Sequence, residues 1–139
     1  MAECGFQGTV GEFIECCDSN LIAETIRAGL NSNKKTTNNE FRSWRDGLQK
    51  LANFLRLNGN INQMILGLGI TCELRVGNSR ADVILTGRND GLPVAVVMEL
   101  KQWSVEGIGP GSSMNNLMAH VGNEARKEKT HPLFQARSY

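Results

Sequence analysis

The chain has 139 residues, a formal net charge of +1 and 40% hydrophobic residues. This length suits one domain with a real core and excludes two large ones. Because the net charge is so small, charge alone does not indicate a nucleic-acid binder. With no membrane-length apolar run and no signal-like leader, we expect a cytoplasmic protein without membrane contact. The four cysteines lack zinc-finger spacing and are expected to be reduced thiols.

Two amphipathic helices are predicted in the first part of the chain. Thr9 can cap a helix over about residues 10–30. Thr37 and Glu40 have the T-x-x-E form of a capping box, which predicts a second helix over residues 40–57. The apolar face of this second helix comprises Phe41, Trp44, Leu48, Leu51 and Leu55.

Three strand-like segments follow, at residues 70–76, 81–86 and 94–100. The first two are joined by a turn at 76–79 and the last two by a loop at 87–93, which is dense in turn-forming residues. The apolar run from Val94 to Met98 is typical of a buried strand. Links this short favour an antiparallel meander.

The C-terminal part has weaker signals. Residues 107–113 are glycine-rich and are expected to form a loop, and residues 115–121 form either a short strand or a helix. Pro132 suits the first position of a final helix. The overall prediction is an α/β fold, with a mixed sheet around the antiparallel meander and helices packed on it.

The chemistry-bearing constellation lies on the second and third predicted strands. A symmetric hairpin register pairs Asp82 with Glu99, and directly opposed residues lie about 5 Å apart on one face. Two carboxylates so placed repel each other unless a divalent cation lies between them, and Mg²⁺ binds such oxygen ligands. Lys101 follows two residues after Glu99, so a strand would place it on the same face.

An ammonium group beside such a metal can orient or deprotonate the attacking water or stabilise a phosphate in the transition state. The alternative is that Asp82 only begins a strand while Glu99 and Lys101 form a solvated strand end. The residues alone leave these two interpretations open.

Two stretches, Arg80-Ala-Asp-Val-Ile-Leu-Thr-Gly87 and Val96-Val-Met-Glu-Leu-Lys-Gln-Trp103, resemble the PD-(D/E)xK (restriction-endonuclease-like) nuclease superfamily. The chain is similar to the N-terminal nuclease-like domain of bacterial proteins with a Schlafen-type helicase module. Its ending, His131–Tyr139, contains the Q-x-x-x-Y motif of RecB-like and lambda-type exonucleases. The similarity touches most of the chain, but only 80–87, 96–103 and 131–139 are specific.

The resemblance implies roles for individual residues. Asp82 and Glu99 become metal ligands, with the Leu100 carbonyl and the helical acid Glu40 as further ligands, and Lys101 becomes the catalytic lysine. The implied cofactor is Mg²⁺ or Mn²⁺. The residues assigned to nucleic-acid binding are Arg80, Gln102, Gln135 and Tyr139. Glu40 has a competing role, because it also completes the capping box with Thr37.

Two departures from the superfamily pattern are visible. Ala81 stands where many members have Pro, and the strand that usually follows the Q-x-x-x-Y helix is missing after Tyr139. We therefore expect residues 1–139 to form a single domain that is truncated at its C-terminus. Either the chain belongs to a longer polypeptide with a helicase module, or it forms a homo-oligomer.

The expected function is metal-dependent hydrolysis of phosphodiester bonds in DNA or, as a weaker expectation, RNA. One alternative is a catalytically silent nucleic-acid-binding module of a helicase-linked protein. The other is a protein-interaction domain in which the acidic pair belongs to a structural charge network. The presence together of Asp82, Glu99 and Lys101 favours the nuclease.

Overall fold

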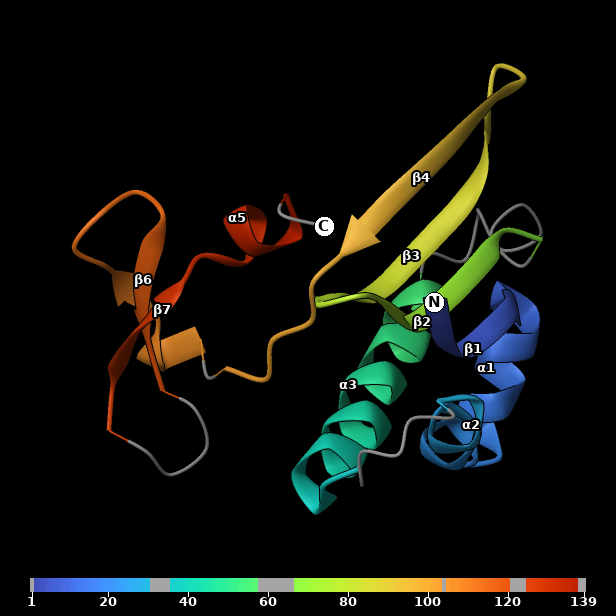
Figure 1. The fold of residues 1–139 in the computed structure, drawn as a ribbon, viewed down its shortest axis with the longest axis horizontal. Coiled ribbons are helices and arrows are strands. Elements are labelled where there is room, and N and C mark those ends of the chain that lie inside the picture. Colours follow the sequence, from blue (N-terminus) through green and yellow to red (C-terminus); the bar gives the residue numbers. More distant parts are fainter. Residues whose placement is uncertain (1, 31–35, 58–66, 104, 121–124, 138–139) are drawn as a thin grey trace. The chain divides into compact units, whose positions relative to one another are not determined.

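The computed structural model describes most of the chain. The chain divides into two compact units, Met1–Met98 and Glu99–Tyr139 (Figure 1). The described residues are 2–30, 36–57, 67–103, 105–120 and 125–137. No described helix combines the length and apolarity needed to cross a membrane.

Among its described residues, the first unit has a four-stranded antiparallel sheet and three helices. The strand order is β1-β2-β3-β4, a meander in which each strand pairs with its neighbour in the list. The predicted meander is therefore confirmed. Every described strand pair is antiparallel, whereas a mixed sheet was expected. The elements are β1 (Ala2–Thr9), α1 (Val10–Asp18), α2 (Ile22–Gly29), α3 (Asn38–Leu57), β2 (Gly69–Val76), β3 (Ser79–Asn89) and β4 (Leu92–Met98).

The N-terminal segment departs from its prediction. Residues 2–9 form strand β1, which was not predicted and which pairs with β2 about sixty residues along the chain. Thr9 does cap a helix, and its capping box with Glu12 is complete. However, the single helix expected over residues 10–30 is two helices, because Asn20 has a φ of 58° between α1 and α2. A left-handed residue breaks the helical hydrogen-bond pattern.

The core lies between the helices and the sheet, and α3 supplies much of it. The predicted capping box at Thr37 and Glu40 is present, and the helix begins at Asn38, two residues before its expected start. Because α3 is amphipathic, one face enters the core, beside α1 and α2. The buried α3 residues are Trp44, Leu48, Leu51, Ala52 and Leu55.

The β3–β4 hairpin is longer and tighter than predicted. Asp90 and Gly91 have φ angles of 50° and 78°, as in the two-residue turn that Asp-Gly favours. The loop expected at 87–93 is therefore mostly strand. The run from Val94 to Met98 was expected to be buried, but Val96 is 51% exposed. Strand β4, which contains this run, lies at an edge of the sheet (Figure 1).

The second unit contains a small three-stranded sheet with the order β5-β6-β7, again antiparallel. Of residues 115–121, which were left open as a short strand or a helix, 116–119 form strand β6. The loop expected at 107–113 includes strand β5. Pro132 begins the final helix as predicted, and His131 caps it by accepting a hydrogen bond from the Leu133 amide. The elements are a 3₁₀ turn (Val105–Gly107), β5 (Gly109–Pro110), β6 (Asn116–Ala119), β7 (Lys127–Thr130) and α5 (Pro132–Ala136).

Candidate functional site

The β2–β3 turn places two arginines side by side in the first unit. In the antiparallel register, Arg75 lies opposite Arg80, and the chain reverses through Gly77, whose φ of 59° few other residues adopt. Two like charges opposed on neighbouring strands destabilise a sheet unless anionic groups balance them. Here the balancing groups come from α3 and from β2 and β3 themselves.

Arg80 contacts three carboxylates. Its Nη2 lies 2.9 Å from Glu73 Oε1 and 3.5 Å from Asp82 Oδ1, and its Nη1 lies 3.8 Å from Glu40 Oε1. Glu73 and Asp82 therefore share one guanidinium nitrogen. The guanidinium of Arg80 thus lies between Glu73 and the predicted metal ligand Asp82.

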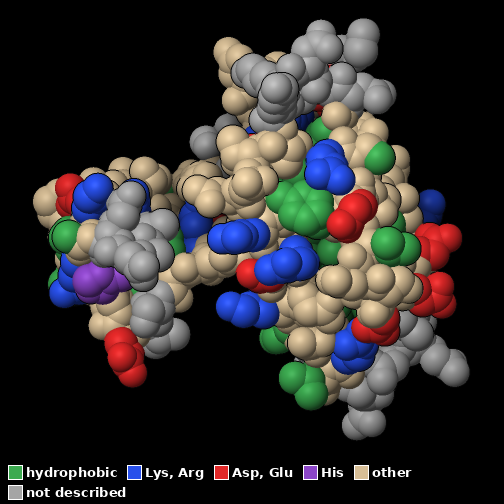
Figure 2. All heavy atoms as spheres, turned by 90° about the horizontal axis from the view of Figure 1, so that it is seen from below, with side chains coloured by type: hydrophobic (Ala, Val, Ile, Leu, Met, Phe, Trp, Pro, Cys, Tyr) green, Lys and Arg blue, Asp and Glu red, His purple; other side chains and the backbone are tan. Residues whose placement is uncertain are grey.

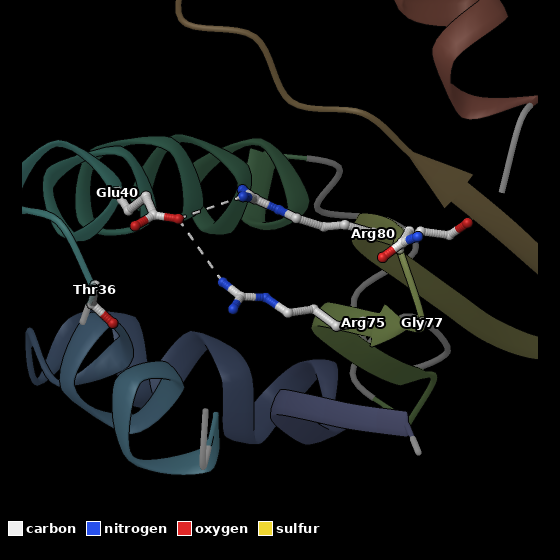
Figure 3. A pocket seen from close by; sticks show the side chains of 7 residues that line it. Thr36, Glu40, Arg75, Gly77 and Arg80 are labelled. Atoms are coloured by element: carbon white, nitrogen blue, oxygen red, sulfur yellow. Dashed lines mark ion pairs between the residues drawn. The ribbon is translucent and has the colours of Figure 1, made fainter. Parts of the chain in front are cut away.

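Glu40 performs the capping role and faces the sheet at the same time. Its Oε2 accepts hydrogen bonds from the Thr37 backbone amide, at 3.0 Å, and from the Thr37 hydroxyl, at 3.1 Å. Its Oε1 faces Arg75 and Arg80, at 4.0 and 3.8 Å (Figure 3). The Thr37 amide, more than the arginines, holds the pKa of Glu40 below its ordinary value. The capping interpretation is confirmed. The other oxygen, Oε1, faces Arg80, which also contacts Asp82.

Glu73 is the residue that sequence reasoning missed. Its side chain is only 3% exposed, and burial raises its pKa, with Arg80 opposing the shift. Its φ of 54° is unusual for a strand residue, and the ladders to β1 and β3 omit it while continuing on either side. Glu73 Oε2 and Trp44 Nε1 have no hydrogen-bond partner among the described residues, although Trp44 lies close enough to favour the ionised carboxylate.

The β2–β3 register places Glu73 opposite a second acid. Between the pairs 72↔83 and 74↔81, position 73 falls opposite Asp82. Two carboxylates therefore meet on adjacent strands, and Asp82 raises the pKa of Glu73 further. Strain of this kind costs about 1–3 kcal/mol and is typical of functional sites.

A pocket of about 350 Å³ lies between the N-terminal end of α3 and the β2–β3 turn. Figure 3 shows the Arg75 and Arg80 side chains extending from their strands toward Glu40 on the helix. The lining is polar, consisting of Thr36, Glu40, Arg75, Gly77, Asn78, Ser79 and Arg80. Such a lining suits a small charged group rather than an apolar ligand.

No family, curated protein or solved structure matches this chain in comparisons of sequence and structure. Functional inference therefore depends on the residues themselves.

The remaining predicted site residues lie in the second unit. Glu99, Leu100, Lys101 and Gln102 follow the end of β4 at Met98, although a strand was expected to continue to Leu100. The expectation that strand alternation aligns Glu99 with Lys101 therefore loses its basis. The two side chains nevertheless form an ion pair, and Lys101 Nζ lies 5.8 Å from the centroid of the Trp103 ring.

The predicted residues thus fall into groups. Glu40, Arg80 and Asp82 come together in the first unit, and Glu99 and Lys101 come together in the second. Gln135 lies on α5, whereas Tyr139 lies outside the described residues, so their common helix face stays a prediction. The convergence of Asp82 with Glu99 also stays a prediction.

Metal-ligating side chains are not densely clustered in the part of the chain that the structure describes. Within residues 2–30, 36–57, 67–103, 105–120 and 125–137, no three His, Cys, Asp or Glu residues gather as a metal would require. Charges of both signs are interspersed, and Figure 2 shows Lys and Arg side chains beside Asp and Glu side chains on one face of the first unit. The four cysteines are free thiols, and burial raises the pKa of Cys17 to about 12.

Proposed function

We propose that the chain is a metal-dependent nuclease of the restriction-endonuclease-like, PD-(D/E)xK type, which hydrolyses phosphodiester bonds in DNA. The observation that carries the proposal is the register of the β3–β4 hairpin. Its ladder ends where Val83 pairs with Met98, and Asp82 and Glu99 are the chain neighbours of that pair. This is the register from which the sequence predicts that the two acids meet.

The donor set of the proposed site fits a hard divalent cation. Asp82 and Glu99 would supply carboxylate oxygens and Leu100 a backbone carbonyl, which are ligands that Mg²⁺ and Mn²⁺ prefer. Mg²⁺ keeps several waters, so few protein ligands suffice. When bound, the metal would polarise the phosphate and acidify a bound water. Glu40 is a weaker candidate ligand, because Thr37 already engages one of its oxygens.

Lys101 has the second role in the proposal. Its ammonium group pairs with Glu99 and lies near the Trp103 ring, so two neighbours restrict its position. A positioned ammonium can hold the attacking water or stabilise the negative charge that develops on the phosphate. Arg80, Gln102, Gln135 and Tyr139 are proposed to contact the nucleic acid.

A second candidate is a nucleic-acid-binding module without catalysis. One observation favours it: the group that lies between the carboxylates of Glu73 and Asp82 is the Arg80 guanidinium. In this case an arginine would neutralise the acids permanently and no metal would be needed.

A nuclease assay separates the two candidates. The purified chain should cleave DNA with Mg²⁺ or Mn²⁺ and not with EDTA. Lys101→Ala should lower the cleavage rate by roughly 100-fold or more, the range for loss of a general acid–base group. Lys50→Ala, which removes an exposed lysine from α3, is the matched control and should cleave normally. Metal-independent retention of DNA without cleavage would instead support the binding module.

A further inference from the structure

We propose that the pocket between α3 and the β2–β3 turn binds a phosphate group through Arg75 and Arg80. No earlier prediction included Arg75 or this pocket. The inference rests on the proposed function in one respect: the phosphate would belong to the backbone of the bound DNA strand. The site itself is built wholly from residues of the first unit.

The first argument is the convergence of two guanidinium groups. Arg75 Nη2 and Arg80 Nη1 point at the same oxygen, Glu40 Oε1, from 4.0 and 3.8 Å. These distances are too long for hydrogen bonds, which for N–H donors extend to about 3.2 Å. Arg75 Nη2 also lies 3.8 Å from Glu73 Oε2, again beyond hydrogen-bond length. Glu40 and Glu73 therefore balance the charge of Arg75 from a distance without occupying its donors closely.

The second argument is that Glu40 is restrained. Its other oxygen holds the Thr37 amide and hydroxyl, so a closer approach to the arginines would strain the capping box. Meanwhile, Arg75 Nε is buried without a hydrogen-bond partner among the residues that the structure describes. A buried donor without a partner is costly, so the Arg75 guanidinium keeps unused hydrogen-bonding capacity.

The third argument concerns the kind of ligand. Guanidinium groups donate in a planar fork that matches the oxygens of phosphate, and paired arginines are typical of phosphate recognition. Thr36, Asn78 and Ser79 add short polar side chains around the same space. The pocket volume of about 350 Å³ accommodates a phosphate together with water. A metal ion is disfavoured here, since the residues described as lining the pocket include two arginines and one carboxylate, Glu40.

The arrangement makes Glu40 a competitor of the ligand. Its Oε1 supplies the negative charge that the phosphate would replace, so removal of that charge should strengthen binding. Glu40→Gln is a suitable change, because Gln can also complete a capping box. This expectation is opposite in sign to that for a metal ligand, whose loss would weaken a metal-dependent activity.

The test measures binding of a fluorescently labelled DNA oligonucleotide to the full chain by anisotropy, in EDTA so that cleavage does not interfere. Arg75→Gln should weaken binding by roughly tenfold and lower the slope of log affinity against log salt by about one. Glu40→Gln should strengthen binding by roughly fivefold. Arg45→Gln, an exposed arginine of α3 paired with Asp46, is the matched control and should stay within about twofold of wild type.

A competition with inorganic phosphate identifies the source of the ligand. Displacement of DNA only by other nucleic acids supports a backbone phosphate, whereas displacement by millimolar phosphate supports a free phosphate compound in the same pocket.

Equal losses of DNA affinity in Arg75→Gln and Arg45→Gln would overturn the proposal, since net charge alone would then explain binding. Weaker binding by a folded Glu40→Gln variant would also overturn it. A Lys101→Ala variant that binds normally but does not cleave would leave this site intact, so the two proposals can fail separately.

Discussion

Glu73 shows how one buried carboxylate can shape its surroundings. It is held by Arg80 at 2.9 Å, faces Asp82 across the β2–β3 ladder and adopts a left-handed φ within a strand. Burial raises its pKa above the ordinary value of 4.5, because the charged form loses its hydration. The folded chain therefore binds a proton at this residue more readily than the unfolded chain does.

This difference predicts a pH-dependent contribution to stability. For an acid whose folded pKa is raised, the stabilising contribution is complete below the unfolded value and is lost as pH rises through the folded value. Each pKa unit corresponds to about 1.4 kcal/mol. In metal-free buffer with EDTA, the unfolding free energy of wild type should fall relative to that of Glu73→Gln as pH rises from 4.5 toward neutrality. Urea denaturation at several pH values measures this; a constant difference between the two proteins would contradict it.

At the scale of elements, the break between α1 and α2 depends on one residue. Asn20 has a φ of 58°, and its amide donates to the Cys17 carbonyl at 2.9 Å, which ends α1. The break then lets α2 turn back onto β1, where a Cβ on Gly29 would lie 2.3 Å from the Gly5 carbonyl oxygen. The position of α2 on the sheet thus depends on a left-handed turn and on a close backbone contact.

Substitution at Asn20 tests this dependence. Asn20→Val should lower the free energy of unfolding by about 1–2 kcal/mol, because a β-branched residue is disfavoured in the left-handed region. Asn20→Gly is the control, since glycine adopts this conformation readily, and it should change stability by less than about 0.5 kcal/mol. Denaturant unfolding monitored by Trp fluorescence provides both values. Equal effects of Val and Gly would show that backbone conformation is not the determining factor.

At the scale of the whole molecule, strand β4 is one of the two edges of the four-stranded sheet. It pairs with β3, and in the part of the chain that the structure describes no further strand follows it in the sheet order. Its apolar side chains are exposed, with Leu92 at 69% and Val94 at 43%. Unpaired apolar edges favour association with another chain.

We therefore expect the chain to form a dimer or larger assembly at micromolar concentration, measured by light scattering. Val96→Lys should shift the assembly to monomer, because charged edge residues oppose strand pairing. Leu57→Lys introduces the same change at an exposed position at the end of α3 and should leave the assembly intact. A monomeric wild type, or equal effects of both substitutions, would count against association through β4.

Local interactions explain what the sequence predicted correctly. Both capping boxes join residues three apart, so Thr9 and Thr37 mark helix starts without knowledge of the fold. The apolar period of α3 is equally local and predicted that helix. The short β2–β3–β4 links predicted the meander, and the symmetry of the β3–β4 hairpin predicted its register. Among the candidate site residues, the Glu40 cap was predictable for the same reason.

Tertiary contacts decided the rest. Strand β1 is stabilised by pairing with β2, whose residues lie 60 to 74 positions further along the chain, a partner that no local pattern reveals. In the sequence, Glu73 and Arg75 are ordinary polar strand positions. In the fold, α3 places Trp44 near Glu73 and Glu40 near Arg75. The exposure of β4 likewise depends on which elements cover the sheet, not on its own apolar composition. Sequence determines local hydrogen bonding and periodicity, whereas burial and the pairing of distant charges exist only once the chain is folded.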